Sequence, residues 1–284
     1  MVNGKGEVTD RWAGYDGVEG FIEQVDKARA DMTTIEEKKE RFKAEPTLAL
    51  ALALGQYSEA VFESDMAVDY YRKSIALDPS LSGEMRAKIF MSMYYGLRSG
   101  TFTPAQLLAE GEAILADPNA DQGAVLMVTS VTRQMGDAEV YRPFLERALE
   151  LTEGNEDADV LEFRKELLVD QALIIEQDKP KALELKRAAM ATGWETDPGG
   201  LNSFAWWCFE NDFNLEEALE LALKGADLAS DDATRANILD TAAEIAFELG
   251  KIDKAVELET EAVKLAPDRD AFKETLERFK TAQG

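Results

Sequence analysis

The stretch from residue 238 to residue 267 constrains the fold of this chain more than any other part of the sequence. Apolar residues recur with helical spacing up to Gly250, and a second such run ends at Pro267. Small residues stand where the two helices would have to touch closely: Ala243, Ala255 and Ala262. A single helix pair cannot bury its apolar face alone, so this pattern predicts neighbouring pairs stacked against it.

The same arrangement recurs along the chain at irregular intervals. One small residue marks the second helix of each predicted pair, 35 to 41 residues after the previous one: Ser74, Ala113, Ala148, Ala189, Gly225 and Ala262. A final amphipathic stretch carries an apolar stripe, which predicts a helix that caps the last pair: Phe272, Leu276 and Phe279. We therefore expect an all-α domain of about six helix pairs over residues 32–284. An irregular helical bundle with repeat-like ends is the alternative.

Capping residues and prolines set the expected helix boundaries. Thr33–Glu36 has the spacing of a capping box, in which a hydroxyl and a glutamate satisfy the first amides of a helix. Thr103-Pro104 and Asp178-Lys179-Pro180 place proline in a first helical turn, where its missing N–H costs no hydrogen bond. Four further residues are followed by proline and mark the end or the start of a helix: Asp78, Asp117, Asp197 and Ala266.

The charge of the chain argues against several classes of partner. Its formal net charge is −25, from 56 acidic and 31 basic residues. Such a field repels phosphate groups, so we expect neither nucleic-acid binding nor binding to a membrane surface. The sequence has no apolar run long enough to span a bilayer and no apolar leader at its start, which predicts a soluble chain.

The residue types present also argue against catalysis. The sequence has no histidine, which removes the commonest general base and a common metal ligand. Cys208 is the only thiol, and without a basic neighbour we expect it to be inert packing. The acidic cluster at residues 155–159 is followed by Val160, where a calcium-binding loop needs glycine. We expect no metal, no cofactor and no catalytic activity.

The helix pairs resemble the tetratricopeptide repeat (TPR). The last pair carries the resemblance most fully, and the pair at residues 48–81 adds Leu54-Gly55, Ala67, Tyr71 and Asp78-Pro79 at repeat spacing. The resemblance implies a right-handed superhelix, or solenoid, whose concave groove binds a protein or peptide. It therefore implies a TPR-like scaffold without catalytic activity of its own.

The first 31 residues differ from the rest of the chain. A turn is expected at Gly4-Lys5-Gly6, followed by a strand over Glu7–Gly14. An amphipathic helix is expected over Gly17–Ala30, with an inward face made of Phe21, Ile22, Val25 and Ala28. Turn, strand and helix in this order resemble the closing segment of a thioredoxin fold. We expect this helix to pack on the first helix pair and the strand to remain an exposed edge.

A longer run strengthens this second resemblance. Trp194, residues 201–211 and residues 237–245 resemble the helical region that follows the thioredoxin domain in certain bacterial thioredoxin-family proteins. The resemblance implies an exported bacterial protein, with a periplasmic location, although the sequence carries no export signal. It also implies an alternative function, that of an accessory helical domain of a thiol–disulfide oxidoreductase. No Cys-x-x-Cys occurs in the chain, so that dithiol would lie upstream of Met1.

Groove-facing positions on the first helix of each pair give the candidate binding residues. The candidates are Tyr95, Arg98, Arg133, Gln134 and Trp206. Arg98 and Arg133 would fall on adjacent pairs, where two guanidinium groups could hold a carboxylate of an acidic peptide. The alternative is that both arginines pair with local carboxylates.

Trp206 and Trp207 cannot both point inward, because adjacent residues lie about 100° apart around a helix. We place Trp206 toward the concave groove as an apolar anchor for a peptide; burial of both rings is the alternative. Together with Tyr94 and Tyr95, these rings also allow a small-molecule or carbohydrate binder as a further alternative. The identity of the partner and the oligomeric state do not follow from the sequence.

Overall fold

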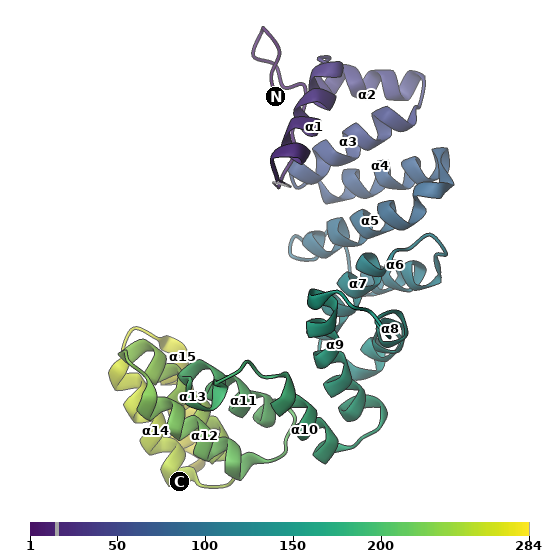
Figure 1. Cartoon of the computed structure of the whole chain (residues 1–284). Helices are drawn as coiled ribbons and strands as arrows, with labels where there is room; N and C mark the ends of the chain where they lie inside the picture. Colours follow the sequence, from purple (N-terminus) through teal and green to yellow (C-terminus); the bar gives the residue numbers. More distant parts are fainter. Residues whose placement is uncertain (15–16, 284) are drawn as a thin grey trace. The chain divides into compact units, whose positions relative to one another are not determined.

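The computed structural model describes residues 1–14 and 17–283, and most of this part of the chain is helical (Figure 1). The expected all-helical fold is thus confirmed. The chain divides into two compact units, Met1–Gly154 and Asn155–Gly284, which we call the N-terminal unit and the C-terminal unit. The domain boundary expected between residues 31 and 32 stays a prediction. No helix in the described residues is long and apolar enough to cross a membrane.

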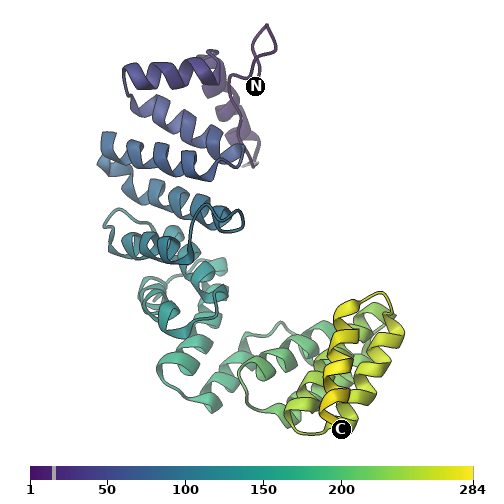
Figure 2. The ribbon, with the colours of Figure 1, turned by 180° about the vertical axis from the view of Figure 1, so that it is seen from behind.

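In the N-terminal unit each helix from α2 to α8 packs against the next one along the chain (Figure 2). The helices are α1 (Gly17–Ala30), α2 (Ile35–Ala44), α3 (Leu48–Ala60), α4 (Ser64–Leu77), the 3₁₀ turn η1 (Pro79–Leu81), α5 (Ser82–Leu97), α6 (Pro104–Ala116), α7 (Gln122–Gln134) and α8 (Ala138–Leu151). Helix α1 is the exception, because it runs at a steep angle to α2 and α3, which lie side by side (Figure 1).

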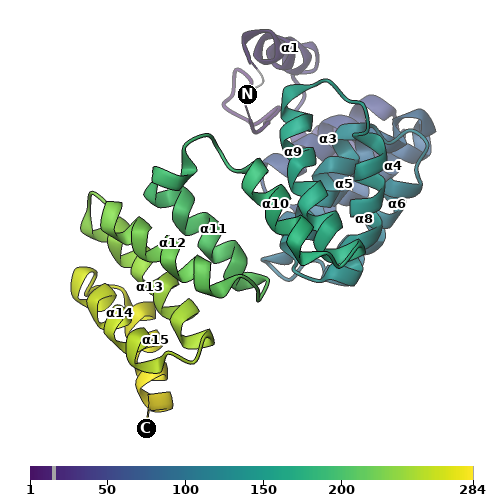
Figure 3. The same cartoon turned by 60° about the horizontal axis from the view of Figure 1, so that its bottom comes forward.

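In the C-terminal unit α9 packs against α10, and α11 to α15 pack each against the next, as Figure 3 shows. The helices are α9 (Ala158–Asp170), the π-helical turn η2 (Gln171–Ile175), α10 (Lys179–Ala189), the 3₁₀ turn η3 (Trp194–Thr196), α11 (Pro198–Glu210), α12 (Leu215–Leu228), α13 (Asp232–Glu248), α14 (Ile252–Leu265) and α15 (Asp270–Gln283).

The predicted pairing of helices is confirmed within both units. The six marker residues fall on the second helix of successive pairs, namely α4, α6, α8, α10, α12 and α14. The apolar stripe of the last helix, α15, is buried: Phe272, Leu276 and Phe279. The prolines act as expected, since Pro104 opens α6 and Pro180 lies in the first turn of α10.

The capping box of α2 lies one residue later than predicted. Thr34 is the N-cap, and its hydroxyl accepts a hydrogen bond from the amide of Glu37, whose carboxylate accepts one from the Thr34 amide. Thr33 instead donates its hydroxyl to Asp31. The sequence offers two adjacent threonines and two adjacent glutamates, so spacing alone did not distinguish the two registers.

The expected strand over residues 7–14 is wrong. Within the described residues, Val2 and Val8 form one isolated antiparallel bridge around the turn at Gly4-Lys5-Gly6. Val2 and Val8 remain 55% and 44% exposed. Two short segments without a third strand or an apolar cover are too weak to hold a sheet. The thioredoxin-like strand therefore has no counterpart in the described residues.

The expected inward face of α1 is wrong in its first half. Phe21 and Ile22 are 48% and 53% exposed, and Ala28 is the only residue of this helix that is buried. Helical spacing identified an apolar stripe correctly, but it did not establish which side of the helix meets the protein.

Lys38 fastens the N-terminal segment to α2. Its side chain is 3% exposed and its ammonium donates hydrogen bonds to three backbone carbonyls: those of Thr9 (2.6 Å), Asp31 (3.0 Å) and Thr33 (3.2 Å). The amide of Ile35 also donates to the carbonyl of Val8 at 3.2 Å. A buried ammonium is tolerated only with such partners. The chain before α1 and the chain after it therefore meet at the start of α2.

Candidate binding groove in the N-terminal unit

A cavity of about 690 Å³ lies between α1, α3 and the start of α5. We call it the α1–α3 groove. Its wall on α3 and α5 includes Ala49, Leu52, Ala53, Gln56, Met85 and Lys88. Its facing wall on α1 comprises Gln24, Lys27 and Ala30. The space is within the range of about 300–1,000 Å³ that is usual for ligand sites.

Helix α3 is apolar on both of its sides, and this property produces the groove wall. Its core side is buried against the neighbouring helices: Leu50, Ala51 and Leu54. Its groove side remains half-buried or exposed: Ala49, Leu52 and Ala53. A helix that is apolar all round normally lies inside a protein, covered on every side. The groove side of α3 is therefore an apolar surface with less cover than its composition calls for.

Tyr71 of α4 lines the inner end of the groove. The ring lies close against α3 because position 55 is glycine; a Cβ there would come within 2.6 Å of the ring. The Tyr71 hydroxyl donates a 2.5 Å hydrogen bond to the Glu59 carboxylate. Burial, followed by this contact with Glu59, raises the pKa of Tyr71 far above its usual value. The phenol therefore stays neutral and acts as a fixed part of the wall.

Charged groups of both signs surround the apolar wall. Arg41 pairs with Asp31 at 2.8 Å, and Lys27 pairs with Glu23 at 2.7 Å. The Lys88 ammonium lies 6.0 Å from the centre of the Tyr71 ring. A groove with an apolar centre and mixed polar edges suits a polypeptide, which carries apolar side chains on a backbone of donors and acceptors.

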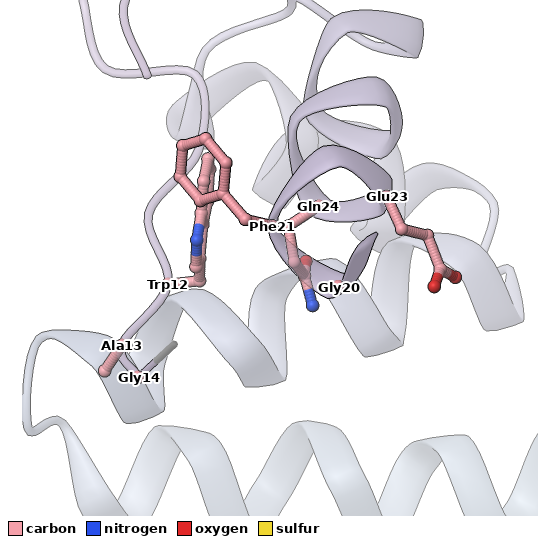
Figure 4. A pocket seen from close by; sticks show the side chains of 7 residues that line it. All are labelled: Trp12, Ala13, Gly14, Gly20, Phe21, Glu23 and Gln24. Atoms are coloured by element: carbon pink, nitrogen blue, oxygen red, sulfur yellow. The ribbon is translucent and has the colours of Figure 1, made fainter. Parts of the chain in front are cut away.

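A smaller hollow of about 230 Å³ lies beside α1 (Figure 4). Trp12 and Phe21 lie against one another there, with ring centroids 6.4 Å apart, while Gln24 points toward the helix beneath. The Gln24 side chain meets α3, because it accepts a 3.0 Å hydrogen bond from the Gln56 amide. The two hollows adjoin one another, because Ala13 and Gln24 line both of them.

Four of the predicted site residues lie at the C-terminal ends of α5 and α7, which pack together in the N-terminal unit. Tyr95 is 51% exposed and its ring lies 5.8 Å from that of Tyr94. Arg98 and Gln134 are exposed, whereas Arg133 is partly buried and already interacts with other groups of the chain. None of the four lines the α1–α3 groove. Their role in binding stays a prediction.

Trp206, the fifth predicted residue, belongs to the C-terminal unit. It is 37% exposed and lies tilted over Phe209, with ring centroids 5.0 Å apart. Trp207 is buried, with its ring edge-on to Phe213 at 5.2 Å. Burial of both tryptophans, the alternative reading, is therefore wrong. Binding by Trp206 stays a prediction.

Cys208 is packed in the core of the C-terminal unit, as expected. Its side chain has no exposed surface, and burial raises the pKa of the thiol to about 11. A thiol of this kind is a poor nucleophile at neutral pH. Across residues 1–14 and 17–283, no group of three or more carboxylate and thiol side chains is placed to hold a metal ion.

The apolar wall of the α1–α3 groove was not predicted from the sequence. Leu52 and Ala53 belong to a run of alternating leucine and alanine, which indicated a buried helix rather than a binding surface. Met85 gave no signal of its own. The clue is that α3 carries apolar residues on its groove side as well as on its core side.

No protein-family model matches this chain, and neither does any curated protein. Similar solved structures include a tetratricopeptide repeat protein from Parabacteroides merdae, 13% identical, covering 92% of this chain and 95% of that one with a TM-score of 0.48. YrrB, a TPR protein with an unusual peptide-binding site, is 18% identical, with coverages of 85% and 98% and a TM-score of 0.34.

The structure of the APC/C hetero-tetramer Cut9–Hcn1 matches at 16% identity over 85% of this chain, with a TM-score of 0.44. This chain spans only 44% of the length of that one. At these identities and TM-scores, the fold assignment rests on the helix pairs described above, which are those of a TPR-like helical repeat.

Proposed function

We propose that this protein is a peptide- or protein-binding helical scaffold, and that the α1–α3 groove is its primary binding site. The observation that carries the proposal is the apolar groove side of α3, which lines a cavity of about 690 Å³ between this helix and α1. Leu52, Ala53 and Met85 offer the apolar contact, and the charged groups at the rim offer hydrogen bonds to a backbone. A partner of this kind gains affinity by burying a few apolar side chains.

Replacing Leu52 with glutamate is expected to weaken peptide binding at least about tenfold. The new carboxylate would stand in the apolar wall, where an apolar side chain of the peptide would remove it from water. Peptides would first be selected by phage display against the full-length chain, and their affinities would then be measured by fluorescence anisotropy.

Leu77→Glu is the matched control, because Leu77 is 43% exposed at the end of α4 and does not line the groove. Its affinity for the same peptides should equal that of the unmodified chain. If both variants bind equally well, the groove is not the site; if no peptide is selected at all, the proposal of a peptide scaffold fails.

We also propose Arg98 and Arg133 as a second contact region for acidic peptides. Both lie in the N-terminal unit, at the ends of helices that pack together. The double variant Arg98→Glu/Arg133→Glu should lose at least about tenfold in affinity for acidic members of the selected set, because two attractive charges become repulsive. Its helical circular dichroism should not change.

Arg147→Glu provides the control for this charge reversal. Arg147 is exposed on α8 and pairs locally with Glu150 at 2.9 Å. An equal loss of affinity in this control would mean that the effect comes from net charge and not from a contact site. Unaltered affinity in the double variant would remove these two arginines, and the neighbouring Tyr95 and Gln134, from the proposal.

The accessory role beside a thioredoxin-type dithiol gains no support from the described residues. The expected strand is not formed, and the lone thiol is buried with a raised pKa. We therefore propose binding alone, without a redox step in this chain. The carbohydrate alternative rests on Tyr95 and Trp206, which lie in different units.

A further inference from the structure

The chain before α1 and the chain after it are held at one place, while α1 itself forms one wall of the groove. The Lys38 ammonium donates to the carbonyl of Thr9, before α1, and to those of Asp31 and Thr33, after it. The Arg41–Asp31 ion pair adds a second attachment on the later side. The chain segments on both sides of α1 are therefore bonded to the same part of α2.

The body of α1 is held far more weakly than its ends. Ala28 is its only buried residue, and three large apolar side chains are about half exposed or more: Val18 (65% exposed), Ile22 (53%) and Phe21 (48%). Among the described residues, a single side-chain hydrogen bond joins this helix to α3, between Gln24 and Gln56. A helix with so few buried apolar contacts opens at a low free-energy cost.

Space for a ligand exists beneath α1 while the helix is in place. The cavity of about 690 Å³ has Gln24, Lys27 and Ala30 of α1 on one side and the apolar side of α3 on the other. A helix that only blocked the groove would fill it with its own apolar residues. Here those residues are about half exposed or more, so α1 forms a wall of the site.

We propose that α1 is a flap, attached through Lys38, that opens to admit a peptide and closes over it. The peptide would place its apolar side chains on α3 and contact the polar inner side of α1. This inference rests on the proposed peptide-binding function for its ligand, but the opening of the flap is a property of the free chain.

Opening is therefore tested first without any ligand, by hydrogen exchange. The α1 amides should exchange at least about a hundredfold faster than the core amides of α3, while the amide of Ile35, which donates to the Val8 carbonyl across the attachment point, should stay slow. Equal protection of α1 and α3 would overturn the flap. Loss of protection at Ile35 together with α1 would overturn the fixed attachment.

A labelling experiment adds a direct readout of access to the groove. The thiol of an Ala53→Cys variant should react with a maleimide about three to ten times faster when Gln24→Ala removes the hydrogen bond to Gln56. A thiol introduced by Leu77→Cys, outside the groove, should react at one rate in both backgrounds. Equal rates for Ala53→Cys with and without Gln24 would count against a closed flap.

The closing function is tested with the selected peptides. Gln24→Cys and Gln56→Cys would be joined by a short bis-maleimide, which the buried Cys208 should not attack. Joining the two helices before peptide addition should slow association at least tenfold, and joining them afterwards should slow dissociation by a similar factor. Unchanged association and dissociation rates would overturn the flap even if the peptides bind. If the α1 amides exchange fast and the Ala53→Cys thiol is labelled as expected, but no peptide binds, the flap stands and only its proposed ligand is removed.

Discussion

Replacing Glu259 with glutamine is expected to stabilise the C-terminal unit at neutral and alkaline pH. Glu259 on α14 has no exposed surface, and neither of its carboxylate oxygens makes a hydrogen bond of regular geometry. Burial first, and then the neighbouring carboxylates of Asp240 and Glu244 on α13, raise its pKa to about 8, although Arg278 acts to lower it. Glutamine keeps the shape of the side chain and cannot ionise.

The pH dependence follows from the direction of this shift. Below about pH 4.5 the carboxyl group is protonated in both the folded and the unfolded chain, so it does not make the free energy of unfolding depend on pH. Between about pH 4.5 and pH 8 the unfolded chain gives up the proton while the folded chain keeps it. Stability is therefore lost as the pH rises through this range, and the pKa of Asp240, raised to about 6 mainly by burial, acts in the same direction at lower pH.

Urea unfolding at pH 5 and pH 8.5 measures the effect. Glu259→Gln should raise the free energy of unfolding by on the order of 3 kcal/mol at the higher pH and change it little at the lower one. A Trp12→Phe background confines tryptophan fluorescence to the C-terminal unit, which contains the other three tryptophans. Glu257→Gln, on the same helix but exposed, is the control and should change stability by less than about 0.5 kcal/mol. An equal effect at both pH values would contradict a buried, protonated Glu259.

Replacing Gly83 with alanine is expected to destabilise the N-terminal unit by about 2–4 kcal/mol. Gly83 lies in the first turn of α5, and a Cβ at this position would come within 2.0 Å of the backbone oxygen of Asn119. Because the obstructing atom belongs to the main chain, no side-chain rotation can relieve the clash. The segment after α6 would have to move away from α5.

That movement would also break a polar contact between the same two segments. The Ser82 hydroxyl donates to Asp117 at 3.0 Å and accepts from the Asn119 side chain at 2.9 Å. Thermal unfolding of Gly83→Ala measures the loss. Gly123→Ala is the control, since its nearest neighbour would be 3.4 Å away and alanine favours the helix by about 0.5–1 kcal/mol. A melting temperature for Gly83→Ala equal to that of the unmodified chain would contradict the close approach.

The features predicted well from the sequence are those that local chemistry determines. Apolar spacing, prolines in first turns and small residues at close contacts were enough to place the second helix of each pair, and Cys208 was correctly assigned to the core. These signals act within a few residues of one another. They therefore carry the same meaning in the sequence and in the folded chain.

The features predicted poorly depend on residues that are distant in sequence. The strand near Val8 failed because pairing partners, not local alternation, decide whether a sheet forms. The exposure of Phe21 depends on which side of α1 meets the rest of the protein, and periodicity does not report this. The groove wall at Leu52 was hidden for a similar reason, because its sequence is that of a core helix and its partial exposure depends on where α1 lies.

The π-helical turn at Gln171–Ile175 bears on how the length of such units can change. It continues α9 directly, so an extra residue is accommodated inside the helix instead of in a connecting loop. The interval between Ala148 and Ala189, the longest in the chain, contains this turn. During evolution an insertion of one residue can thus be accommodated in the middle of a helix. It rotates the side chains beyond it by roughly 100° around the helix axis and does not lengthen a connecting loop. Divergence in length among related units can therefore alter which residues reach a shared face while the architecture is preserved.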